Sequence, residues 1–385
     1  MNQLNTGTET SSAAELAELR SSVRDFLAAK SGEQQVRAAI ETERGYDEDL
    51  WRQLTEQLAL TSLALPGEYG GDGFGFTELQ VVLEEMGRAL TPSPFLASVV
   101  LAAGAILAAG DEVAAKAYLP GIAAGTTTAT LAVAESSGLW SFDQMTTVAS
   151  PAADGAGWLL TGTKQFVLHG ATADLIIVAA HTEQGPGFFA VKPGPARGAA
   201  FTRAPLRTLD LTRPMAKLQF SGTPATMIGT AGAAGPVLDA VLDRAMTALA
   251  AEQVGAARAC LEASAAYARE RHQFGRPIGS FQAVKHKCAD MLVKVELAQA
   301  AATEAARAAA GDPDAAPLPQ AAAVAHAVCS ESLMFVAAEN IQVHGGIGFT
   351  WEHPAHLYFR RAKASQLMFG GPGFYFEHLL RRSGL

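Results

Sequence analysis

The spacing of apolar residues divides this chain into parts with different secondary structure. Three-to-four spacing, typical of amphipathic helices, runs through residues 13–125 and returns from residue 233 onwards. In the later part, one face of a long helix carries Val237, Leu238, Val241, Leu242, Ala245, Leu249 and Ala256. A chain with two separate helical parts must bury two sets of apolar stripes, so we expect two helical modules.

The part between them is of a different kind. Short β-branched and aromatic runs, such as WLLTGTKQFVLHG and DLIIVAA, are separated by Gly, Pro and Asp, as in consecutive antiparallel strands. Within the first run, TGTK predicts a tight turn that joins two strands. The order predicts an α+β fold with an N-terminal helical domain (1–125), a middle antiparallel β domain (126–232) and a C-terminal four-helix bundle (233–385).

The composition favours a globular protein and excludes some partners. Of 385 residues, 49% are hydrophobic, and the net charge of −9 argues against a phosphate backbone as partner. The N-terminus shows no signal peptide, and no uninterrupted apolar run reaches the roughly 20 residues that a membrane span needs. The cysteines Cys260, Cys288 and Cys329 form no CxxC pair, which indicates a reducing compartment. We expect a cytoplasmic protein that binds neither nucleic acid nor membranes.

The stretch RERHQFGRPIGSFQ interrupts the second helical part, which resumes at once. Arg271 offers a planar, always-charged fork that suits a diphosphate. Phe274 and Phe281 offer aromatic faces, Gly275 lets backbone approach a ligand, and Gln282 both donates and accepts. Two interpretations stay open on these residues alone: a nucleotide-binding surface, or an ordinary corner between two helices.

A second stretch, QVHGGIGFTWEHP, follows a later helix. Gly345 and Gly346 can end that helix and expose backbone N–H groups to an anion, although a Gly pair after a helix is commonly only a cap. His353 and His356 have no third ligand nearby in the sequence, so we predict no metal site.

Taken together, the two motifs RxxFGxxIxxFQ and QxxGGxGF resemble the acyl-CoA dehydrogenase flavoprotein family. The loop ALPGEYGGDGFGF, the segment GWLLTGTKQFVLHGATADLIIVAA and the basic segment RRAKASQL near Arg360 are similar to that family as well. The resemblance runs in the right order from about Ala13 to the C-terminus. Among its members, the chain resembles bacterial side-chain-degrading ones that lack the C-terminal catalytic Glu.

The resemblance implies FAD bound between the β domain and the C-terminal bundle. It also implies that a neighbouring subunit supplies part of each FAD site, so the protein is expected to be a dimer or tetramer, either homomeric or with a related subunit. Arg271 and Phe274 would contact FAD, and Phe281 and Gln282 would form the neighbouring flavin-binding pair. Gln342, Gly345 and Gly346 would touch the FAD of the adjacent subunit.

The sequence departs from the family around the flavin ring. Typical members back the ring with Trp-Ile-Thr or Trp-Ile-Ser, and the hydroxyl bonds the reactive edge. Phe166 and Leu168 stand in these places, which keeps an aromatic face but loses the hydroxyl. The usual Thr-Glu-Pro-rich loop is matched clearly only by Glu135. We still predict Glu135, Phe166 and Leu168 as cofactor-binding positions.

The base that removes the substrate α-proton is also missing from its usual place. Phe369 stands where most members have the Glu of a Tyr-Glu-Gly-Thr segment, and Ala245 stands where a minority carry it. Glu252 lies on the core-facing stripe, where partial desolvation favours proton uptake by a general base. We predict Glu252 as the base. The alternative is a structural Glu, paired with Arg258 or bonded to backbone.

The predicted function is FAD-dependent oxidation of an acyl-CoA to the trans-2-enoyl-CoA in lipid catabolism. Glu252 would take the α-proton, the β-hydrogen would pass to the flavin as hydride, and an electron-transferring flavoprotein would accept the electrons. Two alternatives stay open: a non-catalytic partner subunit of a hetero-oligomeric dehydrogenase, and a flavin oxidase or monooxygenase. Small residues along Ala245–Ala257 would leave room for a bulky or branched acyl chain.

Overall fold

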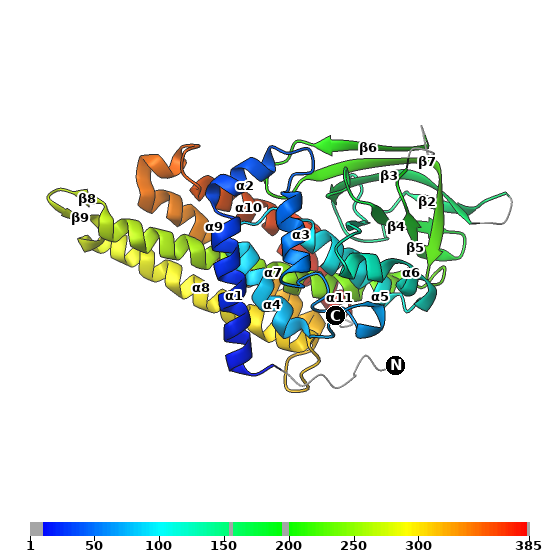
Figure 1. Cartoon of the computed structure of the whole chain (residues 1–385), viewed down its shortest axis with the longest axis horizontal. Coiled ribbons are helices and arrows are strands. Elements are labelled where there is room, and N and C mark those ends of the chain that lie inside the picture. Colours follow the sequence, from blue (N-terminus) through cyan, green and yellow to red (C-terminus); the bar gives the residue numbers. More distant parts are fainter. Residues whose placement is uncertain (1–10, 154–156, 195–199, 383–385) are drawn as a thin grey trace.

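The protein consists of a helical part, a sheet and a second helical part, in that order along the chain (Figure 1). The structure is a computed structural model and describes residues 11–153, 157–194 and 200–382. This order confirms the fold class predicted from the sequence. The predicted boundary at 125/126 lies between the last N-terminal helix and the first strand. The predicted boundary at 232/233 lies between the last strand and the helix that follows it.

The N-terminal helices begin at well-formed caps. Ser12 and Glu15 form a capping box at the first helix, and Asp47 and Asp111 each accept two backbone N–H bonds at later helix starts. The helices are α1 (Ala13–Lys30), α2 (Glu33–Ile40), α3 (Glu48–Glu56), α4 (Phe76–Arg88), the π-helical turn η2 (Leu96–Ala102), α5 (Ala103–Ala108) and α6 (Glu112–Ala123), with the short 3-10 turn η1 (Gly67–Tyr69) before α4.

The sheet closes on itself. Its strands run in the order β1-β4-β2-β3-β7-β5, β5 pairs back onto β4, and β6 adds to the edge of β7. The strands are β1 (Ala129–Ala132), β2 (Val148–Pro151), β3 (Trp158–Leu168), β4 (Leu175–Thr182), β5 (Gly185–Val191), β6 (Phe201–Leu206) and β7 (Met215–Ile228). Most pairs are antiparallel, as predicted, but β1 and β2 both run parallel to β4.

The tight turn predicted at TGTK is wrong. β3 is one continuous strand that pairs with β7 along its length, with register shifts after Leu160 and after Lys164. Gly162 has a φ of +150°, and a Cβ at this position would collide with Thr147. The glycine therefore permits a close approach between neighbouring segments inside an irregular strand, which a sequence pattern does not distinguish from a turn.

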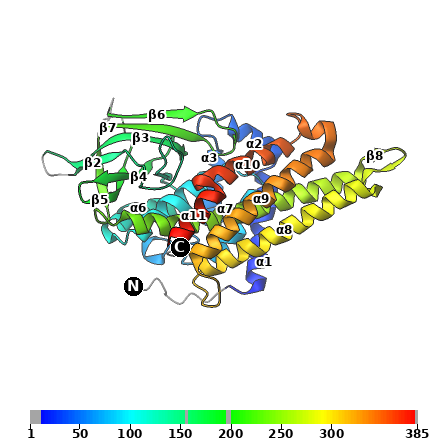
Figure 2. The ribbon, with the colours of Figure 1, turned by 180° about the vertical axis from the view of Figure 1, so that it is seen from behind.

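The C-terminal part consists of long helices with one hairpin between them. Its helices are α7 (Ala234–Glu270), α8 (Gln282–Ala309), α9 (Leu318–His344), α10 (Ala355–Leu367) and α11 (Gly371–Arg382), with the 3-10 turns η4 (Ile278–Ser280), η5 (Gly345–Phe349) and η6 (Met368–Gly370) between them. The two-residue strands β8 (His272–Gln273) and β9 (Arg276–Pro277) form the hairpin between α7 and α8. Figure 2 shows this hairpin at the end of the molecule that is farthest from the sheet.

One segment of this part, Leu318–Phe349, is long and apolar enough to cross a membrane. However, 67% of its most apolar window is buried inside the protein, as in the central helix of a bundle. Its apolar character is explained by packing against α7, α8 and α10.

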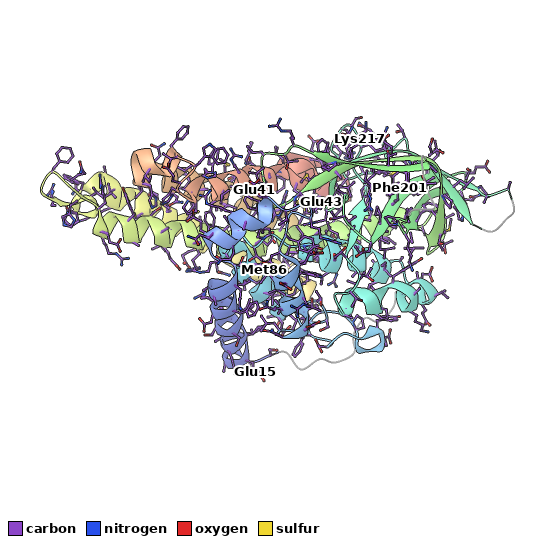
Figure 3. All side chains as sticks on the ribbon, turned by 45° about the horizontal axis from the view of Figure 1, so that its top comes forward. Glu15, Glu41, Glu43, Met86, Phe201 and Lys217 are labelled. Atoms are coloured by element: carbon purple, nitrogen blue, oxygen red, sulfur yellow. The ribbon has the colours of Figure 1, made fainter. Side chains whose placement is uncertain are left out.

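α4 and α7 pack backbone against backbone at the centre of the molecule. A Cβ on Gly255 of α7 would collide with the carbonyl oxygen of Glu84, and a Cβ on Gly87 of α4 would collide with that of Glu252. Met86, which is buried in this layer, lies among the helices in Figure 3, whereas Phe201 and Lys217 lie on the sheet. The small residues of Ala245–Ala257 therefore allow close helix packing. At Gly255 the small side chain serves this contact, and the room for a bulky acyl chain along the segment stays a prediction.

We predict that Gly255→Ala destabilises the protein by about 3 kcal/mol, because the added methyl group forces two helix backbones apart. Gly235→Ala on the same helix is the matched control, since nothing lies within 4 Å of its added Cβ. Urea unfolding of both variants measures the difference. Equal stability of the two variants would contradict the packing described.

Candidate functional site

The hairpin carries the predicted flavin-contacting residues into solvent. Arg271 caps the end of α7 through its backbone N–H, which donates to Tyr267, and its side chain is exposed. Phe274 is 90% exposed and has a φ of +53°, followed by Gly275 at +77°. The ring of Phe281 lies edge-on to Phe274, with centroids 6.0 Å apart. This left-handed tip projects an arginine and an aromatic ring away from the chain's own core.

The residues predicted at the second motif are exposed as well. Gln342 lies in the last turn of α9, and Gly345 ends that helix with a φ of +65°. Gly346 follows within η5, where Phe349 is 84% exposed. Ile347 and Trp351 are also exposed, at 41% and 61%, so this short segment presents several large apolar side chains at the surface.

The remaining predicted positions lie at the other end of the molecule. Phe166 and Leu168 end β3, and Glu135 follows β1, so all three belong to the sheet region. Figure 1 shows the β8–β9 hairpin and the sheet at opposite ends of the long axis. If both Arg271 and Phe166 contact one FAD as predicted, they do so from two different chains.

At the sheet edge, Phe166 has a φ of +56° and is 42% exposed. Leu168 is buried and pairs with Met215 of β7, and its carbonyl oxygen accepts a hydrogen bond from the Thr130 hydroxyl at 2.6 Å. The Leu168 side chain brings no donor to the place where a flavin edge would need one.

Glu135 has its carboxylate fully engaged within the chain. Thr146 and Thr147 each donate through backbone N–H and hydroxyl, at 2.6 to 2.9 Å, and the buried Lys164 ammonium lies 2.9 Å away. Burial raises the pKa of Glu135, but these hydrogen bonds and the lysine outweigh it and lower the pKa to about 2. The carboxylate therefore closes a loop from Glu135 to Thr147 and has little capacity left for a cofactor.

Phe369, which the sequence predicts at the place of the family base, makes a buried aromatic contact. Phe369 is 1% exposed and has a φ of +62°. The indole of Trp140 lies against it, edge to face, with ring centroids 5.0 Å apart and planes at 86°. We call Trp140 and Phe369 the aromatic plug.

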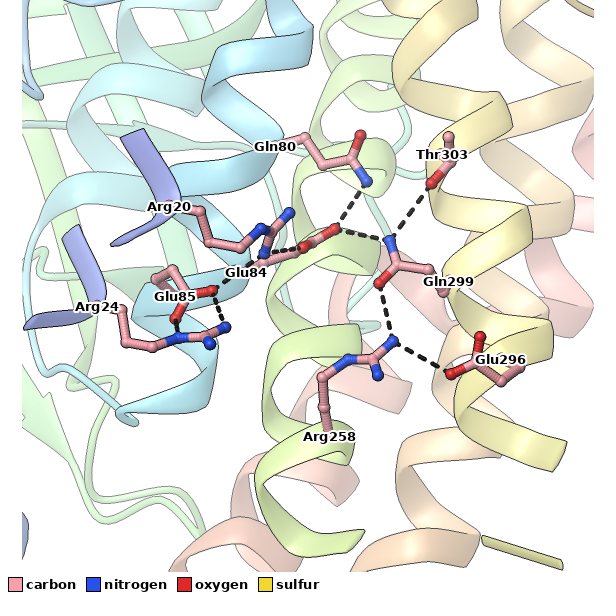
Figure 4. A network of polar contacts seen from close by, with 9 residues as sticks. All are labelled: Arg20, Arg24, Gln80, Glu84, Glu85, Arg258, Glu296, Gln299 and Thr303. Atoms are coloured by element: carbon pink, nitrogen blue, oxygen red, sulfur yellow. Dashed lines mark hydrogen bonds and ion pairs between the residues drawn. The ribbon is translucent and has the colours of Figure 1, made fainter. Parts of the chain in front are cut away.

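Glu252 lies between two arginines. Its carboxylate forms a buried ion pair with Arg213 and lies 3.8 Å from the Arg361 guanidinium. The predicted burial of Glu252 is present, since 8% of the residue is exposed. Its partner is not Arg258, which instead reaches Glu296 and Gln299 of α8 (Figure 4).

The two arginines extend this arrangement into a buried ionic cluster of Asp210, Arg213, Glu252 and Arg361. Arg361 lies 3.1 Å from the Asp210 carboxylate and donates to the Thr212 hydroxyl. Arg213 donates to the Ser365 hydroxyl at 2.7 Å. The cluster thereby joins the connection between β6 and β7 to both α7 and α10.

Sequence reasoning missed Arg213, Asp210 and Trp140. A signal for the first two was available, because LDLTRP places an acid and an arginine among apolar residues. Such charges are buried only when they are paired. Nothing local identifies Trp140, because its contact with Phe369 joins distant segments.

These residues do not fit a flavin ring bound within this chain. A flavin ring between Phe166 and Phe369 would need the space that the segment Gly138–Trp140 occupies. Gly138 lies beside the Phe166 ring, which would be 3.9 Å from an added Cβ, and Trp140 contacts Phe369. The cavity beside this segment, bordered by Leu139, has a volume of about 200 Å³.

Comparison with known proteins identifies the family. Residues 13–126 match the acyl-CoA dehydrogenase N-terminal domain, and residues 235–382 match the acyl-CoA dehydrogenase C-terminal domain. Acyl-CoA dehydrogenase IpdE2 of Mycobacterium tuberculosis is 36% identical over 364 residues, which cover 94% of each chain. The chain belongs to the acyl-CoA dehydrogenase family, whose members generally bind FAD.

Two solved relatives are complexes of different chains. The ChsE4–ChsE5 complex from Mycobacterium tuberculosis matches with a TM-score of 0.85 and 30% identity, covering 98% of this chain and 99% of that chain. The Tcur3481–Tcur3483 steroid ACAD variant matches with a TM-score of 0.83 and 33% identity, covering 96% and 98%. Heteromeric assembly therefore occurs among the relatives of this chain.

We predict that Glu252→Gln lowers the free energy of unfolding by about 3 kcal/mol, because it leaves two buried guanidinium groups without a full counter-charge. The matched control is Glu296→Gln, which removes an exposed carboxylate from Arg258 and should cost less than about 1 kcal/mol. Denaturant unfolding at neutral pH measures both. A Glu252→Gln variant as stable as the wild type would contradict a structural role and favour the predicted base.

Proposed function

We propose that this chain is a subunit of a heteromeric acyl-CoA dehydrogenase that completes the FAD site of a related catalytic chain and abstracts no proton itself. The observation that carries the proposal is the buried contact of Phe369 with Trp140 at the position of the family base. A phenyl ring accepts no proton, and losing a positioned general base costs about 10²–10⁴-fold in rate.

The other acidic candidate is committed elsewhere. For Glu252 to accept a substrate proton, its carboxylate would have to leave Arg213 and Arg361. Neutralising it would leave their guanidinium groups buried with less counter-charge, which is costly in a low-dielectric interior. A self-sufficient dehydrogenase with Glu252 as base remains the second candidate. The burial of Glu252 on α7 favours it.

The exposed motifs supply what a partner subunit needs. The Arg271 guanidinium can bind a diphosphate through parallel N–H bonds, and Phe274 can pack on a ring of the same cofactor. Nothing lies within 4 Å of a Cβ added at Gly345 or Gly346, so this surface is open to a cofactor, while the Gly345 N–H itself caps α9 by donating to the carbonyl oxygens of Gln342 and Ile341. Because these residues point away from the chain's own core, they would contact FAD held by a neighbour.

The assembly would convert an acyl-CoA into the 2-enoyl-CoA and pass electrons to an electron-transferring flavoprotein. The partner chain would supply the base and the pocket for the acyl group, and this chain would supply contacts to the cofactor. Likeness to the Tcur3481–Tcur3483 steroid ACAD supports a steroid-linked acyl thioester as the substrate class.

We predict that Arg271→Gln lowers the FAD content of the assembly formed with a co-expressed, Glu-bearing chain of the family. A charge-assisted pair with a phosphate contributes about 1.5–3 kcal/mol, so FAD should dissociate roughly tenfold to a hundredfold more readily. Flavin absorbance after dilution and gel filtration measures the loss.

Arg269→Gln is the matched control, because this exposed arginine lies on the same end of α7, outside the predicted motif. It should leave the FAD content unchanged. Equal FAD retention in the two variants would contradict a role of Arg271 in the neighbour's site.

A further inference from the structure

The segment Gly138–Trp140 spans the whole distance between the two positions that would face a flavin ring. Its first residue lies beside Phe166, and its last residue lies against Phe369. Gly138 has a φ of +74° and its backbone N–H donates to the Glu135 carbonyl oxygen at 3.0 Å, which forms a turn. The left-handed turn leads the chain inward, so that Trp140 is 7% exposed although it belongs to a loop.

The loop that carries Trp140 is held at both ends by a single carboxylate. Glu135 stands at its start and accepts hydrogen bonds from Thr146 and Thr147 at its end. Lys164 on β3 fixes the same carboxylate to the sheet and also donates to the Val133 carbonyl oxygen. Because the loop is closed on itself and attached to β3, Trp140 is held in place by the sheet.

Phe369 is held from the opposite side. It adopts a left-handed φ, which a non-glycine residue keeps only when its surroundings fix it. Gly370 and Gly371 follow with φ values of +107° and +79°, and a Cβ on Gly370 would press on Leu139. On the other side, Ser365 is bonded to Arg213 of the ionic cluster. Both rings of the plug are therefore fixed by groups outside the plug.

We infer that Trp140 and Phe369 close a flavin-ring site in this chain that is otherwise built. The sheet edge at Phe166, the buried Leu168 and the closed loop frame the site, and the two plug rings fill it. An indole and a phenyl ring together are close in size to the three fused rings of an isoalloxazine. This inference rests on the proposed function, because a subunit that serves its neighbour's FAD has its own ring site closed.

The test removes both plug rings in the full-length chain. The double variant Trp140→Ala, Phe369→Gly deletes the rings, and glycine suits the left-handed φ at position 369. FAD is the probe, and equilibrium dialysis measures binding through the visible absorbance of the flavin. ADP in excess blocks binding through the nucleotide end alone. Trp158→Ala, which deletes an indole that packs on Phe189 elsewhere in the sheet, is the matched control.

We expect the double variant to bind FAD at least about tenfold more tightly than the wild type, and excess ADP should not abolish this binding. Trp158→Ala should bind no better than the wild type. Stoichiometric FAD binding by the wild type, or a folded double variant that binds no better than Trp158→Ala, would overturn the inference.

Should the double variant not fold, the single variant Phe369→Gly is measured in the same way. An FAD affinity above that of the wild type, even if the gain is smaller than that expected of the double variant, supports the inference. An FAD affinity equal to that of the wild type overturns it. The proposed function fails by a different result, namely acyl-CoA oxidation by the wild-type chain alone. FAD binding by the wild type without acyl-CoA oxidation would overturn only the inference that the aromatic plug closes the flavin-ring site.

Discussion

The ion pair between Glu252 and Arg213 holds together the parts of this molecule on which its function depends. Glu252 lies on α7, the helix that contacts α4, α8 and α9, and Arg213 lies directly before β7. Arg361 of α10 joins the same carboxylate to Asp210, so that one buried cluster links the sheet to two helices. Buried charges of this kind give little net stability, because desolvation offsets their attraction. They do fix one arrangement of the parts, since any other would leave charges unpaired.

That arrangement has two consequences at opposite ends of the chain. Near the sheet, Arg213 of the ionic cluster donates a hydrogen bond to the Ser365 hydroxyl. The aromatic plug there fills the space that we infer a flavin ring would need. At the far end, α7 carries Arg271 and the exposed Phe274 beyond the bundle. The same helix thus joins the ionic cluster to the exposed hairpin that carries the predicted motif. The division of labour that we propose between two related chains rests on this geometry, with one chain holding the cofactor and the other completing its surroundings.

The sequence was sufficient for the fold but not for the chemistry of the candidate site. Helical periodicity correctly predicted that helices return after residue 233, because a repeat of 3.6 residues is a local property. TGTK was misinterpreted because Gly162 serves a close approach within a strand rather than a turn. Glu252 was correctly expected to be buried, but its partners come from distant segments. The small residues beside it predict space for an acyl chain, but a sequence does not show that Gly255 instead lets two helix backbones touch. Burial can be predicted from a stripe of residues, but the identity of the contacting group cannot.

The most direct test of the central claim is an anaerobic titration of this chain, purified alone and supplied with FAD, against a panel of straight, branched and steroid-linked acyl-CoAs. The flavin absorbance should stay unchanged with every member of the panel. The same panel should bleach the flavin once a Glu-bearing partner chain of the family is added. Bleaching with the chain alone, lost on Glu252→Gln, would contradict the account and establish a self-sufficient dehydrogenase.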